Sequence, residues 1–139
     1  MLPHSYGANM FIYNLPTDVK KLRGWPAEWF WRKIAAAPRP TDTPLMADAM
    51  WRGAGPNCGG AGATKSTGPL PPSYNGEWGD LDHEMKHLAI VRHGKGSQLV
   101  FFDGSVRMVK IKGLWRLEWH RGYNFLAVDL IKFPTWMPN

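Results

Sequence analysis

Cysteine is almost absent from this chain of 139 residues, because Cys58 is the only one. A lone cysteine excludes an intrachain disulfide and any zinc site built from several cysteines. The sequence also has no run of eighteen apolar residues, which excludes a membrane-spanning helix. Its first residues have neither the basic start nor the apolar stretch of a secretory signal peptide. The sequence therefore predicts no targeting signal and no membrane contact through this chain itself.

Blocks of like charge are absent as well. The chain carries 17 Lys and Arg against 11 Asp and Glu, a formal net charge of +6. The basic side chains are scattered along the sequence, whereas a nucleic-acid-binding tail would gather five or six of them in one run. A solvated basic surface is the simpler interpretation. We therefore predict no nucleic-acid partner.

Glycine and proline are abundant, with 15 and 12 residues respectively. This composition favours turns over long helices. The range 52–80 is so rich in both residues that we predict one long surface loop there. The part that follows the loop is too short to form a robust core alone, so residues 1–139 are expected to form a single domain.

Aromatic residues are plentiful, with eight Trp, six Phe and four Tyr. Because each ring buries a large area, packing in the core and at its rim is the simplest interpretation. An exposed and coplanar set would instead indicate an aromatic-lined module that binds glycans or a surface. The tryptophans considered for both roles are Trp29, Trp31, Trp51, Trp115 and Trp119.

Two strands and one short helix are predicted before the loop. The range 5–13 has the composition of an extended segment. The range 26–37 is predicted as a short helix, because proline suits a first helical turn and the apolar residues follow helical spacing. The range 43–51 alternates as a strand does. Its apolar face would hold Leu45, Ala47, Ala49 and Trp51.

A three-stranded antiparallel meander is predicted after the loop, from strands 88–93, 98–102 and 105–111. Asp103-Gly104 predicts a two-residue type I′ turn, which needs positive φ at both positions. A short helix is expected at 114–119, followed by an aromatic tail packed on the domain. The expected fold class is α+β, with a short helix packed on an antiparallel sheet.

The sequence also resembles a known family. His93, followed after nine residues by Asp103-Gly104, matches the pattern that names the prepilin-type processing-associated H-X9-DG domain. Other segments are similar to the usual family sequence and occur in the same order, so the resemblance covers nearly the whole chain. They are Ser5-Tyr6-Gly7-x-Asn9, the stretch from Thr43 through Asp48 to Ala49, Arg92-His93, the stretch from Phe102 to Val106, Leu114-Trp115 and Pro134-x-Trp136-Met137.

This resemblance implies a pilin-like (pseudopilin) globular domain that acts as a non-catalytic structural subunit or accessory of a type II secretion or type IV pilin-like assembly. Other pilin-like subunits or secretion-system proteins would be its partners. Its location would be the cell envelope, on the periplasmic or extracellular face. Family members carry a cleaved leader and a long apolar helix, and this chain contains neither. We therefore expect it to be the C-terminal globular part of such a protein.

His93 and Asp103 are residue types that can form a catalytic or metal-binding pair. In the predicted meander, however, a strand of five residues separates them, roughly 17 Å at about 3.3 Å per residue. We therefore predict structural roles. Asp103 and Gly104 would form the turn, and His93 would hydrogen-bond to backbone at the mouth of the hairpin.

The segment His83-Glu84-Met85-Lys86-His87 contains the His-Glu-x-x-His pattern of helical zinc hydrolases. In this alternative function, His83 and His87 would bind zinc from one helix face, and Glu84 would be the general base. The segment is short and no clear third ligand follows it. Asp80 and Asp82 are candidate ligands for calcium or another divalent ion. The preferred prediction is that the chain has no cofactor and no catalytic residue.

Overall fold

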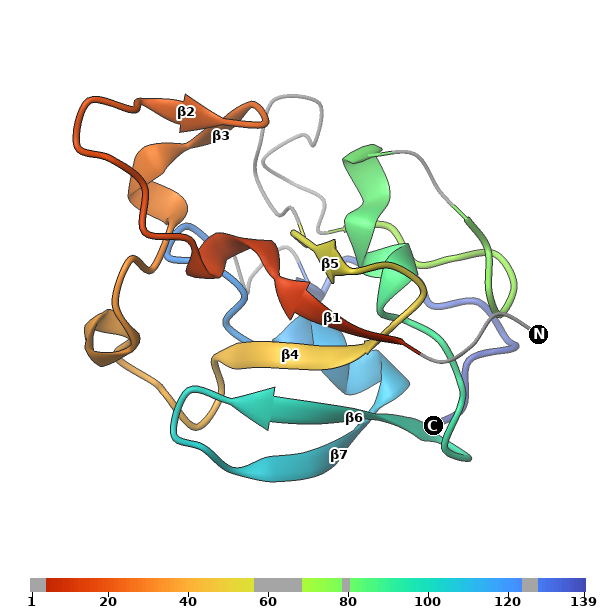
Figure 1. Ribbon diagram of the computed structural model, residues 1–139. Helices are drawn as coiled ribbons and strands as arrows, with labels where there is room; N and C mark the ends of the chain where they lie inside the picture. Colours follow the sequence, from red (N-terminus) through yellow and green to blue (C-terminus); the bar gives the residue numbers. More distant parts are fainter. Residues whose placement is uncertain (1–4, 57–68, 79–80, 124–127) are drawn as a thin grey trace.

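A five-stranded sheet lies at the centre of the computed structural model, which describes residues 5–56, 69–78, 81–123 and 128–139 (Figure 1). The strand order is β5-β1-β4-β6-β7. All neighbouring strands are antiparallel except β1 and β5, so the sheet is mixed. The strands are β1 (Ser5–Asn9), β4 (Pro44–Ala49), β5 (Gly53–Ala54), β6 (Gly96–Phe101) and β7 (Val106–Lys110).

Short 3-10 helices and a small hairpin complete the described elements. The hairpin joins β2 (Lys21–Leu22) to β3 (Trp25–Pro26). The architecture agrees with an α+β class whose helical content is low. No helix in the described ranges is long and apolar enough to cross a membrane. The 3-10 helices are η1 (Met10–Ile12), η2 (Ala27–Trp29), η3 (Ile34–Ala36), η4 (Leu81–His87) and η5 (Ile111–Arg116).

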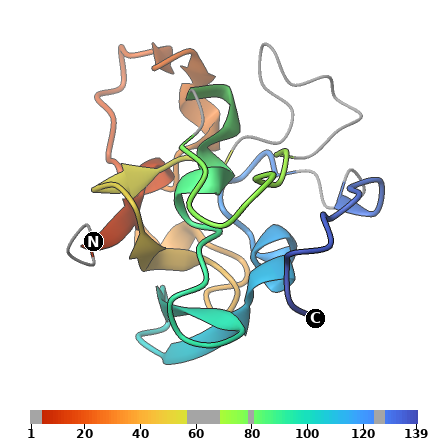
Figure 2. The same cartoon turned by 90° about the vertical axis from the view of Figure 1, so that its right-hand side faces the viewer.

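The core is built on one face of this sheet, which we call the inner face. Ala47, Ala49, Leu99 and Phe101 project from β4 and β6 into a buried cluster with residues of η5. Figure 1 shows η5 behind the sheet on this side, and Figure 2 shows it beside the sheet. A second buried cluster forms beside the β2–β3 hairpin. It contains Phe11, Leu15, Trp25, Ala27, Phe30, Trp31, Ala37 and Phe102.

The predicted strand at 5–13 ends early, at Asn9. The Asn9 side chain accepts a hydrogen bond from the Phe11 N–H (3.1 Å) and so starts η1. Its amide nitrogen donates to the carbonyl oxygens of Pro44 and Trp119, both at 2.9 Å. This buried side chain thus links β1, β4 and the segment after η5.

The prediction of a helix at 26–37 is wrong. The range contains two separate 3-10 turns, η2 and η3, with extended backbone between them. Trp31 donates its N–H to the carbonyl of Phe11 (2.8 Å) instead of to a preceding helical turn. Phe30 and Trp31 are both buried in the cluster beside the β2–β3 hairpin, and this long-range packing overrides the helical pattern of the local sequence.

The three-stranded meander is only partly present. β6 and β7 form its hairpin, but residues 88–93 are not a strand, and only an isolated bridge joins His93 to Gly96. Leu88, Ala89 and Ile90 are all buried, and a continuous apolar run does not reveal its conformation by periodicity. The third strand beside the hairpin is β4, far away in the sequence.

The turn between β6 and β7 also differs from the prediction. Gly104 has a positive φ of 84°, but Asp103 does not have a positive φ, so the turn is not type I′. The Phe101 N–H donates to the Ser105 carbonyl (2.9 Å), and the Gly104 N–H donates to the Phe101 carbonyl (3.0 Å). These bonds enclose a three-residue loop in which glycine takes the left-handed position.

Other predictions meet mixed outcomes. The helix expected at 114–119 is the 3-10 helix η5, which begins and ends earlier. The range 52–80 is not entirely loop, because it contains β5. Two tryptophan side-chain N–H groups bind the described residues 69–78 of this range. Trp115 donates to Pro69 O (2.6 Å), and Trp136 of the C-terminal tail donates to Pro72 O (2.9 Å). The tail therefore packs back on the domain, as predicted.

Candidate functional site

The other face of the sheet, which we call the outer face, is not covered by any described element (Figures 1 and 2). Directly opposed residues of paired strands project to the same face. The pairs Tyr6–Asp48, Gln98–Met108 and Val100–Val106 therefore place their side chains together on it. Its exposed apolar side chains are Tyr6, Met46, Val106 and Met108.

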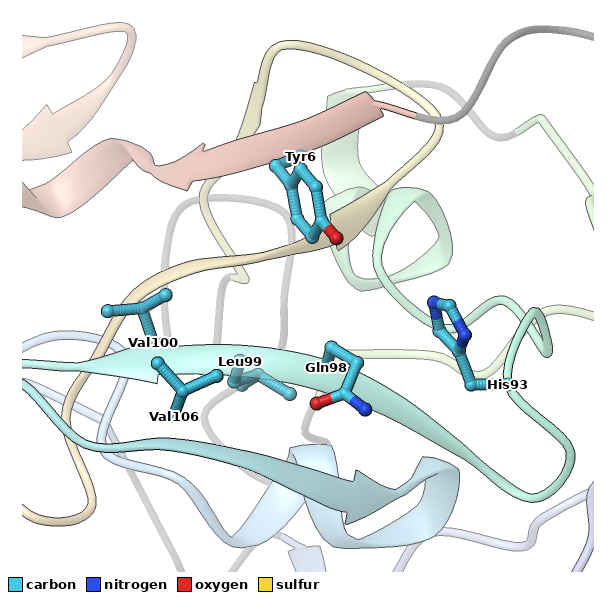
Figure 3. A pocket seen from close by; sticks show the side chains of 6 residues that line it. All are labelled: Tyr6, His93, Gln98, Leu99, Val100 and Val106. Carbon is cyan, nitrogen blue, oxygen red and sulfur yellow. The ribbon is translucent and has the colours of Figure 1, made fainter.

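A hollow of about 410 Å³ lies on this outer face. Figure 3 shows Val100 and Val106 at one end and Gln98 and His93 at the other, with Tyr6 facing them from β1. Its volume falls within the range of roughly 300–1,000 Å³ that is typical of ligand pockets. The hollow therefore combines an apolar end with a polar end. Its lining residues are Tyr6, His93, Gln98, Leu99, Val100 and Val106.

Asp48 anchors the polar end. Its side chain is only 3% exposed, and its Oδ2 lies 3.2 Å from Nε2 of His93. The same oxygen accepts a hydrogen bond from the backbone N–H of Gln98 (2.8 Å). These two partners compensate the burial of the carboxylate. They also tie β4, β6 and the turn before β6 together.

The partner of His93 differs from the prediction, because a buried carboxylate and not a backbone group holds its side chain. Asp48 fixes one ring nitrogen, while the side chain remains 43% exposed. Sequence reasoning did not assign Asp48 to a site. The available signal was a single acidic residue in the apolar stretch Pro44–Ala49, where a buried charge needs a partner.

Asp103 lies at the opposite end of β6 from His93, so the two do not form one site. Its Oδ1 accepts hydrogen bonds from the Ser105 hydroxyl (2.7 Å) and from the Ser105 N–H (2.9 Å). These bonds hold the pKa of Asp103 below its ordinary value, with the hydroxyl as the larger cause. Asp103 therefore stabilises the turn before β7.

The His-Glu-x-x-His pattern lies on the 3-10 helix η4. A 3-10 helix has three residues per turn, whereas the zinc-binding pattern requires the 3.6-residue period of an α-helix to bring positions four apart onto one face. Asp80 lies outside the described residues, as do the side chains of Asp82 and His83. No group of three or more potential metal ligands occurs in the part of the chain that the structure describes.

Glu84 is buried, and polar contacts hold both of its carboxylate oxygens. Its buried carboxylate accepts a hydrogen bond from the Gly55 N–H through one oxygen and pairs with Arg23 Nη2 (3.0 Å) through the other. Burial raises the pKa of Glu84, while Gly55 and Arg23 act in the opposite direction. His87, also buried, stacks on Trp78 with ring centroids 4.4 Å apart.

The tryptophans divide between core and surface. Trp31, Trp115 and Trp119 are buried, as predicted for packing. Trp51 and Trp78 are exposed and in contact, with ring centroids 5.5 Å apart. Their rings meet at 78°, edge to face, so this pair does not form the coplanar platform that the glycan-binding alternative requires.

His120 is a second histidine that sequence reasoning did not single out. It is fully buried, and burial lowers its pKa to about 3. Its ring stacks on Trp29 with centroids 4.4 Å apart and contacts Phe11 at 4.5 Å. Nδ1 accepts a hydrogen bond from the Gly122 N–H (3.1 Å). Enclosure by aromatic rings makes this imidazole a neutral core residue.

Comparison of the chain with protein-family models, curated proteins and solved structures finds no match. The family resemblance therefore rests on the sequence motifs alone. The outer-face hollow offers hydrogen-bonding groups beside an apolar wall, which suits binding. No serine, threonine or cysteine side chain is among the described residues that line it.

Proposed function

We propose that this chain is the globular part of a pseudopilin-like protein, a non-catalytic structural subunit or accessory of a pilin-like secretion assembly in the cell envelope. Its partners would be other pilin-like subunits or secretion-system proteins. One observation carries the proposal: the residues that resemble the family make the long-range contacts that hold the domain together.

The central contact joins two of the resembling segments. Asp48, in the first of them, pairs with His93 in the second (3.2 Å). The remaining motif residues, Asp103 and Gly104, form the turn at the far end of β6. A motif that maintains the geometry of a sheet is consistent with a structural subunit.

The other resembling segments make similar contacts. Asn9 donates hydrogen bonds to Pro44 O and Trp119 O. Trp115 is fully buried, and Trp136 donates to Pro72 O. Because these contacts join positions far apart in the sequence, they support a framework role for the whole set of segments.

The zinc-hydrolase alternative has weaker support. A general base must reach the water that it activates, whereas both carboxylate oxygens of Glu84 contact other residues. The glycan-binding alternative is weakened by the edge-to-face geometry of Trp51 and Trp78.

Photo-crosslinking in the cells that encode the protein would test the proposal. A photoreactive amino acid would replace exposed residues one at a time, at Tyr74, Leu130 and Val106, and Leu99 would be a buried control. We expect the exposed positions to capture proteins that have a long apolar N-terminal helix, identified by mass spectrometry. Capture only of proteins without such a helix would contradict the proposal. Stoichiometric zinc, together with hydrolytic activity lost in Glu84→Gln, would also contradict it.

A further inference from the structure

We propose that the free edge of β7, together with the adjoining outer-face hollow, is a docking site for an extended acidic–apolar peptide segment of a partner protein. The segment would add a strand to the sheet. This proposal is independent of the pilin-like assignment, because it rests only on the backbone, exposure and charge of the β7 region.

β7 is the last strand of the sheet, and no described strand pairs with its edge on the side away from β6. Hydrogen bonding alternates along an antiparallel pair, so every second residue points its backbone groups away from the partner. The Phe101 N–H donates to Ser105 O (2.9 Å), and the Ile111 N–H donates to Lys95 O (3.2 Å). These two bonds fix the phase of the alternation.

With this phase, Arg107 and Val109 direct their backbone groups toward β6. Val106, Met108 and Lys110 direct theirs toward the free edge. A strand laid along β7 would therefore meet donors and acceptors from these three residues. This is the geometry by which extended peptides extend a sheet.

The same three residues also expose their side chains on the outer face. Val106 is 66% exposed and Met108 is 49% exposed. Residues of an added strand that lie opposite them would project to the same face. Backbone pairing and apolar contact are therefore available along one line, from Val106 to Lys110.

The hollow begins at Val106 and extends across β6 toward Tyr6 (Figure 3). A large apolar side chain opposite Val106 would lean over this residue and contact Val100. The hollow therefore favours an aromatic or large aliphatic residue at this position of the segment.

Charge selects the other end of the segment. Lys110 lies opposite Gly96, beside the exposed Lys95 of the preceding turn. Asp48 also lies on the outer face, but it is buried and paired with His93, so its carboxylate does not neutralise Lys110. An acidic side chain opposite Lys110 would gain a favourable contact. A second copy of the chain would place Lys110 near another basic edge, and both copies carry +6.

Peptide binding to the intact chain would test the proposal. The probe is the acetylated heptapeptide amide Thr-Glu-Thr-Val-Thr-Phe-Thr, which in antiparallel pairing places Glu, Val and Phe opposite Lys110, Met108 and Val106. We expect slower amide hydrogen exchange and NMR shift changes at these three residues. A peptide with Lys in place of Glu is expected to bind about tenfold more weakly. N-methylation of the central Val, which removes an N–H group, is expected to abolish the protection.

Two pairs of matched variants sharpen the test. Val106→Asp is compared with Leu130→Asp, because both residues are 66% exposed. Lys110→Glu is compared with Lys132→Glu, since both lysines are exposed. We expect the β7 member of each pair to weaken binding by at least about tenfold while the other member has no effect. Lys110→Glu should regain binding to the peptide that carries Lys.

Three results would overturn the proposal. The first is no protection of the β7 amides at millimolar peptide concentrations. The second is equal binding of the N-methylated peptide. The third is an equal loss of affinity in both members of a variant pair. The charge-swap arm keeps the test decisive, because it measures a gain of binding that a misfolded variant cannot show.

Discussion

Acidification is expected to destabilise the domain through His120 at pH values where carboxylates are still largely ionised. Burial lowers the pKa of His120 from 6.5 to about 3 in the folded protein. The ring contacts Phe11 and Trp29, and the described residues provide no hydrogen-bond partner for Nε2. The unfolded chain exposes this imidazole to water and lets it bind a proton at its ordinary pKa.

The sign and size of this effect follow from proton linkage. Between pH 6.5 and pH 3 the unfolded state binds one more proton at this residue, so stability falls as pH falls. The slope is about 1.4 kcal/mol per pH unit inside the window. Between pH 7 and pH 5 the expected loss from His120 alone is about 2 kcal/mol. This is a large part of the stability of a small domain, about 5–15 kcal/mol.

The assay compares urea unfolding of the wild-type protein with that of His120→Phe and His120→Leu at pH 7, 6 and 5. Tryptophan fluorescence reports the transition. Carboxylates contribute equally to all three proteins, so the difference between wild type and variant isolates the histidine. Relative to either variant, the wild type is expected to lose about 2 kcal/mol between pH 7 and pH 5. The second variant guards against overpacking by the larger phenylalanine ring.

Parallel stability curves for wild type and both variants would refute this reasoning. They would mean that His120 binds protons equally in the folded and unfolded states. A direct NMR titration of the imidazole gives an independent check. We expect no change in the His120 ring signals of the folded protein above pH 5, whereas an ordinary titration near pH 6.5 would contradict the burial argument.

Three further predictions concern the sheet and its supports. Gly104→Ala should lower the free energy of unfolding in a urea titration by about 1–2 kcal/mol, because the positive φ of Gly104 disfavours a side chain although the space around it is open. Gly104→Asn should lower it less, because asparagine tolerates a positive φ better than alanine. Equal losses in the two variants would contradict the role of the positive φ. Asp48→Asn should lower the free energy of unfolding by about 1–3 kcal/mol and His93→Ala should lower it by less, since Asp48 is the buried partner of the pair. A larger loss of thermal stability in His93→Ala than in Asp48→Asn would be inconsistent with the structure. Burial raises the pKa of Glu84, so the stability that this group gives the wild-type protein falls as pH rises above 4.5. The substitution Glu84→Gln should therefore reduce the free energy of unfolding less at pH 7 than at pH 4. A larger reduction at pH 7, measured by calorimetry, would count against the raised pKa.

The sequence predicted elements where alternation was regular. Strand β7 alternates as expected, with Val106 and Met108 on one face and Arg107 and Val109 on the other. The Asp103-Gly104 pair located the turn, although not its type, because a three-residue loop needs positive φ only at the glycine.

Elsewhere, distant contacts determine the local conformation. The backbone N–H of Trp31 bonds to the distant carbonyl of Phe11, and this contact holds an extended conformation where the local sequence favoured a helix. Residues 88–90 are buried between other elements, so no periodicity distinguishes a strand from an irregular segment. The contact between Asp48 and His93 joins positions that sequence spacing alone does not relate.

The nine-residue spacing of the motif corresponds to the length of one central strand and its connections. His93 bridges to Gly96 where β6 begins, and Asp103 follows where β6 ends at Phe101. One end of β6 is therefore held to β4 through Asp48, and the other end is closed by the turn into β7. A strand fixed at both ends cannot slip by one residue, and such a slip would exchange its inner and outer faces. The motif thus explains how the core face and the outer-face hollow are kept in register.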